Sequence, residues 1–220
     1  MDEVQRAQRG EVGELRIGLT RATPLSPQIP RAIFGYRQRY AQVRLQLREI
    51  NTLQQIDALL EDRLDVGIIR KRALPPELEA HTLFVDPLAQ IVREGHPALA
   101  RLQAGGALAL KDFAQEPFVA FHRSAGAGIH DHMIALCAAA GFTPRIAQEA
   151  GEASTLISLA AAGLGAAILP TSCNHIHVEG ARFVRLADAG AHSEVQLAWR
   201  ADAVTPLIRN FTALLRGAFG

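Results

Sequence analysis

Apolar and polar positions follow two periods along the chain, and their order predicts an α/β fold. Short alternating segments typical of strands occur at 15–19 and 43–47, and a short apolar run typical of a buried strand occurs at 65–70. Between them, apolar residues recur at helical spacing over 29–40 and 53–64. Strands that alternate with helices at this interval predict right-handed βαβ units and a parallel sheet covered on both faces.

The second half of the chain continues this alternation. Strands are expected at 88–92, 117–121, 145–149, 166–170, 183–186 and 195–200. Helices are expected at 129–140 and 152–164, each ended by glycine, and in an amphipathic segment from Leu207 to Leu215. The small residues at 124–128 are expected to form a loop. No linker rich in Pro, Gly or Ser separates the halves, so we expect two lobes joined by strands that cross between them, with a small ligand in the cleft between the lobes.

Composition and charge exclude several classes of protein. The chain has 220 residues, of which 49% are hydrophobic and 20% charged, and its formal net charge is +1. This balance argues against a chain that binds nucleic acid by itself. No window reaches the roughly 18 uninterrupted apolar residues of a membrane-spanning helix, and the polar N-terminal segment lacks the apolar core of a secretory signal. We therefore expect no membrane partner.

The number and spacing of cysteines indicate the redox state of the cellular compartment in which the protein folds. Cys137 and Cys173 are the two cysteines of the chain, without C-x-x-C spacing, so neither a disulfide framework nor a zinc knuckle is indicated. This usage favours a reducing, cytoplasmic compartment. A mature exported protein whose signal peptide had been removed would have the same composition.

An ordered set of short motifs runs through most of the chain and resembles the effector-binding domain of LysR-type transcriptional regulators. The set includes Glu14-Leu15-Arg16-Ile17-Gly18, Leu64-Asp65-Val66-Gly67-Ile68, Asp86-Pro87-Leu88, Gly141-Phe142-x-Pro144 and Ala161-Ala162-Gly163-Leu164-Gly165. Its members follow the family's order and nearly its spacing over residues 13–215. No single motif is diagnostic, and the ordered set carries the resemblance.

The resemblance implies a periplasmic-binding-protein-like fold of type II, built from two Rossmann-like subdomains with a ligand cleft between them. Subdomain I would comprise 13–88 and 196–220, and subdomain II 89–195. Residues 1–12 would be the end of the linker helix that follows the winged helix-turn-helix in full-length family members. The chain as given would then be a sensor without its DNA-binding domain.

The function implied by the resemblance is the sensing of an inducer. A small organic acid, of the kind met in aromatic catabolism, would bind in the interlobe cleft and alter how subunits pack. The partners implied are a second copy in a homodimer, a tetramer when full-length, and promoter DNA through the missing N-terminal domain. The first alternative is a solute-binding receptor of a transporter, and the second, less favoured one is an enzyme on the same two-lobed fold.

Ligand-binding candidates in the first half follow the carboxyl ends of predicted strands, where parallel sheets bind ligands. Thr20, Arg21, Ala22 and Thr23 form one such loop, whose alternative role is an exposed surface loop with a solvated Arg21. Thr52 starts a helix directly after a strand, so its hydroxyl and N–H are candidates for the ligand, or it is a plain N-cap, a position open also to Asn51.

Two further candidate groups complete the predicted site. Arg70 ends an apolar strand and is placed to grip a carboxylate in a bidentate manner, although with its cationic neighbours it would also suit a solvated turn. In the second half, the candidates are Ser124, Gly128 and Ile129. Glycines before a helix allow backbone N–H groups over 126–129 to converge on an anion, and a simple tight turn is the alternative.

Metal and catalytic sites are not indicated. On a predicted helix His130 and His132 point about 200° apart and cannot ligate one ion, and His175 and His177 would share a face only in an extended segment. Ser154 and Thr155 lie near a helix start, where capping explains them. Glu149 and Glu152 show no acid partner in the sequence. We therefore expect no enzyme activity, no metal and no cofactor.

Overall fold

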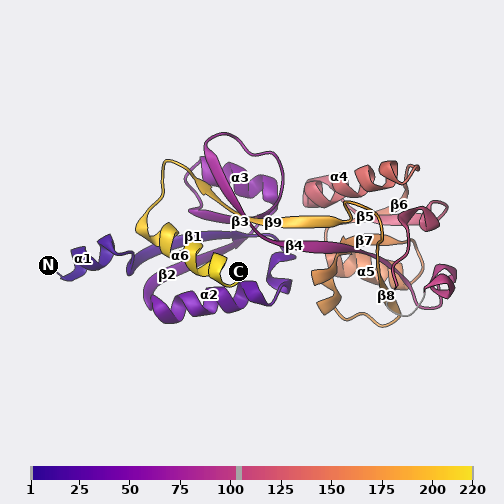
Figure 1. Ribbon diagram of the computed structural model, residues 1–220, viewed down its shortest axis with the longest axis horizontal. Helices are drawn as coiled ribbons and strands as arrows, with labels where there is room; N and C mark the ends of the chain where they lie inside the picture. The colour runs from indigo at the N-terminus through magenta and orange to yellow at the C-terminus, as the bar shows by residue number, and fades with distance from the viewer. Residues whose placement is uncertain (1, 103–105, 220) are drawn as a thin grey trace. The chain divides into compact units, whose positions relative to one another are not determined.

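The computed structural model describes residues 2–102 and 106–219, and the chain divides into two compact units. Unit 1 contains Met1–Val85 and Glu194–Gly220, and unit 2 contains Asp86–Ser193. The chain passes into unit 2 within strand β4 (Leu78–Arg93) and returns within strand β9 (His192–Arg200) (Figure 1). Both units are built from strands and helices, as the sequence predicts.

The sheet of unit 1 is parallel at its centre. Strand β1 (Val12–Leu19) pairs in parallel with β2 (Gln42–Glu49) on one side and with β3 (Val66–Arg70) on the other. Strand β9 then pairs antiparallel with β3, and the order continues to β4. The three parallel strands lie where the hydrophobic pattern predicts them.

Helices cover both faces of this sheet, so the predicted burial of its two faces is confirmed. Helices α2 (Gln28–Arg39) and α6 (Pro206–Gly217) lie on one face and α3 (Thr52–Leu60) on the other, and the short α1 (Asp2–Gln8) precedes β1 (Figure 1). On the α2–α6 face, the fully buried Tyr36 meets the ring of Phe211 edge-on at 5.2 Å. A separate apolar cluster under α3 contains Ile56, Leu59, Leu64 and Ile69.

Unit 2 contains two sets of strands. β5 (Pro117–Phe121) and β6 (Arg145–Ala150) pair in parallel, and β4 pairs antiparallel with both β7 (Ala167–Pro170) and β8 (Ala181–Arg185). Helices α4 (Arg123–Ala139) and α5 (Ala153–Ala161) both contact β5 and lie on opposite sides of it (Figure 1). The remaining elements are single 3₁₀ turns: η1 (Thr23–Leu25) in unit 1, and η2 (Pro97–Arg101), η3 (Leu110–Phe113) and η4 (Thr171–His175) in unit 2.

Two expected boundaries are wrong. Helix α4 begins at Arg123, so the stretch 124–128 is helical and not a loop. Its small residues show no apolar period, and the buried Met133, Leu136 and Cys137 further along pack the helix and offset the cost of two early glycines. Strand β4 begins ten residues before the expected 88, because its burial is irregular over that segment and Pro87 interrupts the pattern.

Both cysteines, Cys137 and Cys173, are buried. Burial raises the pKa of the Cys137 thiol to about 12, with the charge of Asp188 adding to the shift. Within the part of the chain that the structure describes, no helix is long and apolar enough to cross a membrane.

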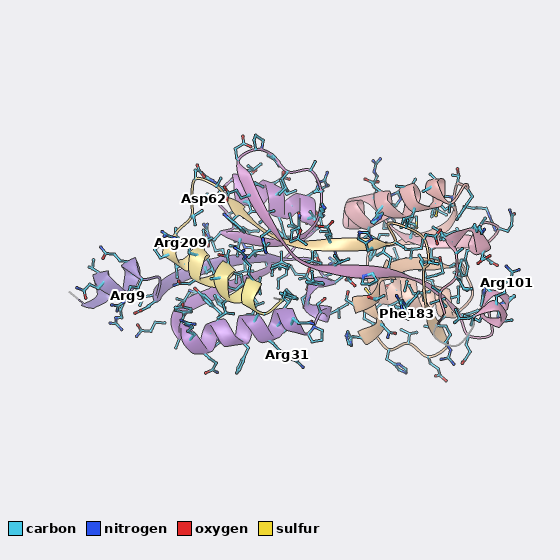
Figure 2. All side chains as sticks on the ribbon, viewed as in Figure 1. Arg9, Arg31, Asp62, Arg101, Phe183 and Arg209 are labelled. Atoms are coloured by element: carbon cyan, nitrogen blue, oxygen red, sulfur yellow. The ribbon has the colours of Figure 1, made fainter. Side chains whose placement is uncertain are left out.

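The turn between α3 and β3 is held by Arg16 of β1. Its guanidinium donates to the Asp65 carboxylate from Nη2 (2.8 Å) and Nε (3.1 Å), and Nη1 donates to the carbonyl of Asp62. Asp62, labelled in Figure 2, has a φ of 56°, in the left-handed region that most side chains avoid. The hydrogen bond to Asp65 is the main cause of the raised pKa of Arg16. Arg16 therefore stabilises a turn that brings the chain from α3 into the central sheet.

Two facing glycines let α3 approach the sheet. Gly18 of β1 is the direct neighbour of Gly67 in β3, and the fully buried Gln55 of α3 lies over both. A Cβ at Gly18 would lie 2.7 Å from Gln55 Oε1 and 2.7 Å from Leu64 Cδ1, and one at Gly67 would lie 2.9 Å from Gln55 Oε1. The sheet thus has no room for side chains at these positions.

We predict that Gly18→Ala lowers the free energy of unfolding by about 1–3 kcal/mol, the usual cost of overpacking a core. Gly35→Ala is the matched control, because a Cβ at Gly35, inside α2, meets nothing within 4 Å. That change should raise stability by about 0.5–1 kcal/mol through helix propensity. Urea unfolding of both variants measures the difference, and equal effects would contradict the close approach of α3.

Candidate functional site

The ends of three segments meet at one edge of unit 1. In the parallel register Leu19 lies opposite Ile68, so β1 and β3 reach their carboxyl ends together. The first residue of α3, Thr52, joins this edge because its Oγ1 accepts a hydrogen bond of 3.2 Å from the backbone N–H of Arg70. The structure therefore brings together Thr52 and Arg70, two of the residues predicted from the sequence.

The N-terminus of α3 is capped by Asn51, which settles the choice between Asn51 and Thr52. Asn51 Oδ1 accepts from the N–H of Gln54 (2.9 Å), and Gln54 Oε1 accepts from the N–H of Asn51 (3.1 Å), a reciprocal capping box. A first helical turn also carries N–H groups with no partner inside the helix. With Gln54 occupied by the cap, those of Thr52 and Leu53 face outward along the helix axis, at its positive end.

The loop after β1 is partly closed by its own side chains. The hydroxyls of Thr20 and Thr23 are hydrogen-bonded to each other, and Thr23 is almost fully buried. Ala22 directly precedes the 3₁₀ turn η1. The Arg21 side chain is 56% exposed, and its Nε lies 3.4 Å from Glu49 Oε1. Of the four predicted loop residues, Thr20 and Thr23 thus bond each other directly after β1, and Arg21 occupies an exposed ion pair.

The three consecutive cations at the end of β3 have different surroundings. Arg70 is buried, with 7% of its surface exposed. The Lys71 ammonium pairs with Glu194 of β9 at 2.5 Å, and Arg72 is exposed. The run is therefore not a uniformly solvated turn, and Arg70 is the cation that lies inside unit 1.

The candidates of unit 2 lie in the first two turns of α4. Ser124 and Gly128 are exposed, and Ile129 packs against the core of the unit. The expected convergence of N–H groups over 126–129 is wrong, because these residues have helical backbone and their N–H groups point along the helix. A helical start at Arg123 leaves the first-turn N–H groups as the donors of this segment.

Three side chains of unit 2 form a cluster that the sequence does not indicate. Glu149 of β6 lies between two histidines, with Oε2 at 3.3 Å from His122 Nδ1 and Oε1 at 4.0 Å from His130 Nε2. His132, two residues along α4, turns away and bonds the carbonyl of Gly190 at 3.1 Å. This cluster depends on the pairing of β5 with β6, which brings together residues almost thirty positions apart in the sequence. No local motif could therefore indicate it.

Comparison with known proteins agrees with this architecture. Residues 8–220 match the family described as the LysR substrate binding domain. The HTH-type transcriptional regulator YnfL of Escherichia coli (strain K12) is 38% identical over 97% of this chain and 71% of its own length. CatR of Pseudomonas putida, another HTH-type transcriptional regulator, is 31% identical over 97% of this chain and 72% of its own length.

Solved structures of regulators have the same fold. The BenM effector-binding domain with its effector benzoate superposes with a TM-score of 0.84 at 25% identity, covering 94% of this chain and 92% of that one. Full-length CbnR in complex with its target DNA superposes with a TM-score of 0.81 at 21% identity, covering all of this chain and 73% of that one. The chain therefore belongs to the LysR substrate-binding domain family, the effector-binding part of LysR-type transcriptional regulators.

Proposed function

We propose that this domain senses a small organic acid, whose carboxylate binds at the N-terminus of α3 in unit 1. The single observation that carries the proposal is the junction of Thr52 with the end of β3, where Thr52 Oγ1 accepts from the N–H of Arg70. That hydrogen bond joins the hydroxyl at the α3 N-terminus to the backbone of Arg70, a buried cationic residue.

Each of these groups suits a carboxylate. The N–H groups of Thr52 and Leu53 donate at the positive end of the helix dipole, where anions bind. The Thr52 hydroxyl already accepts a hydrogen bond, so its own hydrogen is the one to donate to an acid oxygen. The Arg70 guanidinium offers a planar pair of donors that matches a carboxylate.

The relatives support the same ligand class. BenM is described as binding its effector benzoate, and CatR and BenM are relatives at 31% and 29% identity. Benzoate is therefore the first acid to test. In the regulator that contains this domain, we propose that promoter DNA is bound by a separate helix-turn-helix domain in the cytoplasm, and that the domain has no enzyme activity.

We also propose that two copies of the domain pair through an apolar groove on unit 1. The groove has a volume of about 530 Å³ and is lined by Pro30, Ile33, Phe34 and Leu47, together with Arg37 and Glu49. The side chains of Phe34 and Leu47 are exposed by 64% and 51%, which is high for large apolar residues. In a two-fold pair each surface meets itself, so Arg37 of one copy can face Glu49 of the other.

We predict that acids bind and their neutral analogues do not. Calorimetry of the domain with benzoate, other aromatic acids and aliphatic acids, each paired with its amide, should give binding restricted to the acids. An amide that binds as tightly as its acid would contradict the carboxylate role of the α3 end.

With the acid that binds, Arg70→Ala should weaken affinity by about 2–5 kcal/mol, the penalty for leaving a buried charge without its partner. Arg72→Ala is the control, because Arg72 is an exposed cation two residues away. Its effect should stay within about 0.5 kcal/mol. Equal losses in the two variants would assign the effect to general electrostatic attraction.

Thr52→Val should weaken binding of the same acid by about 1.5–3 kcal/mol, because it removes a hydrogen bond to a charged group. Thr52→Ser keeps the hydroxyl and should bind as the wild type does. Thr52→Val also removes the acceptor of the Arg70 N–H, so its folded fraction is checked by circular dichroism before titration. Unchanged affinity in folded Thr52→Val protein would exclude the hydroxyl from the site.

For the proposed pair of copies, Phe34→Glu should shift the domain toward monomer, because it places a carboxylate in an apolar interface. Leu60→Glu changes a partly exposed leucine on α3 and should leave the association unchanged. Sedimentation equilibrium measures both. A wild-type domain that is monomeric at high micromolar concentration, or a Phe34→Glu dimer as tight as the wild type, would overturn this interface.

A further inference from the structure

We propose that Glu194 of β9 makes the acid site of unit 1 selective for ligands that carry one carboxylate. It does so by pairing with Lys71, the cation that directly follows Arg70 at the end of β3. This inference rests on the proposed binding of an acid at the N-terminus of α3. It deepens that function by naming the charge class of the acid, a monocarboxylate.

The register of β3 with β9 places Lys71 and Glu194 opposite each other, just past the paired residues Arg70 and Val195. The N–H of Lys71 donates to the carbonyl of Glu194 at 2.8 Å, so the ladder continues to this pair. Residues opposite each other in a ladder extend their side chains to the same face of the sheet. The ion pair between Lys71 Nζ and Glu194 Oε1, at 2.5 Å, is therefore built on paired backbone.

This ion pair lies on the face of the sheet that α3 covers. Ile69, two residues before Lys71, packs in the apolar cluster that contains Ile56 of α3. Side chains two positions apart in a strand share a face, so Lys71 belongs to the α3 face as well. Thr52, the first residue of α3, accepts from the N–H of Arg70, the residue directly before Lys71. The α3 N-terminus and the ion pair therefore adjoin the same point of the chain.

Further hydrogen bonds hold the Glu194 carboxylate in place. Its Oε2 accepts from the Thr82 hydroxyl of β4 at 3.1 Å, and Thr82 Oγ1 accepts from Gln196 Nε2 at 3.2 Å. Gln196 lies opposite Ile69, which places it on the α3 face too. An ammonium and a hydroxyl thus engage the two oxygens of Glu194, and only 22% of its side chain is exposed.

These charges discriminate between acids by the number of their carboxylates. The proposed function assigns one ligand carboxylate to the N-terminus of α3. A second ligand carboxylate that reached Lys71 would have to displace the carboxylate of Glu194 or lie beside it. Like charges placed side by side repel each other strongly, so a dicarboxylate meets a cost that a monocarboxylate avoids.

The test compares acids that differ by one carboxylate. Affinities for benzoate and isophthalate, and for hexanoate and adipate, are measured by calorimetry with the wild-type domain and with Glu194→Gln. We expect the wild type to bind each monocarboxylate about tenfold or more tightly than its dicarboxylate. Glu194→Gln removes the negative charge and keeps an acceptor of similar shape. That ratio should then fall by about tenfold or more, the usual worth of a hydrogen bond to a charged group.

Lys71 is the group through which this change must act. Addition of Lys71→Met to Glu194→Gln should abolish the gain for the dicarboxylate and leave benzoate affinity within about twofold of wild type. Glu79→Gln is the matched control, because Glu79 is an exposed glutamate of β4, three residues before Thr82 and on the opposite face. It removes the same charge away from the α3 face and should leave the ratio unchanged.

The outcomes separate this inference from the function on which it rests. A ratio that Glu194→Gln leaves unchanged, or that Glu79→Gln changes equally, would overturn the role of Glu194 while the acid site stands. A gain for the dicarboxylate that persists without Lys71 would overturn it as well. Acids that bind no more tightly than their amides would instead remove the proposed function, and this inference with it. A purely structural ion pair predicts altered stability and no change in the ratio.

Discussion

The packing of α3 on the pair of strands β1 and β3 is the constraint on which unit 1 depends. Gln55 fills the space that side chains at positions 18 and 67 would occupy. This space exists only because both positions, which are neighbours in the sheet, are glycine. Its Nε2 donates to the carbonyl of Ile50 at 3.0 Å, which ties the helix to the chain that leads into it. Among the described residues, Gln55 Oε1 has no hydrogen-bond partner, so the fit costs part of the hydrogen bonding of a buried amide.

This packing sets the position of the α3 N-terminus. Because the helix lies close against the sheet, its first residue reaches the end of β3, and the hydrogen bond from Arg70 N–H to Thr52 Oγ1 forms. Asn51 caps the helix and occupies the N–H of Gln54. The donors proposed for the carboxylate are thus held by the fold and not by flexible loops, an arrangement that lowers the entropy cost of binding.

The central strands of unit 1 and two residues of the candidate site could be predicted from the sequence. The features that could not be predicted have physical causes. The alternation in 15–19 and the apolar run at 65–70 predict buried central strands, which β1 and β3 are. The start of α4 has no signal in the sequence, because its alanine, glycine and serine residues carry no apolar period. Of the candidate site, Thr52 and Arg70 could be selected from their places at strand ends, but the hydrogen bond between them depends on how closely α3 packs. Glu149 with its two histidines depends on the β5–β6 register, which a single shift at Phe118 decides.

The central claim is that an acid binds at the N-terminus of α3, and an NMR titration tests it most directly. A ¹⁵N-labelled domain is titrated with the acid that binds most tightly, and the backbone amide resonances are followed. The account predicts that the amides of Thr52 and Leu53 shift most within unit 1, together with those of residues 20–23. Saturable binding that leaves the Thr52 and Leu53 amides unmoved, with shifts concentrated elsewhere in unit 1, would contradict it.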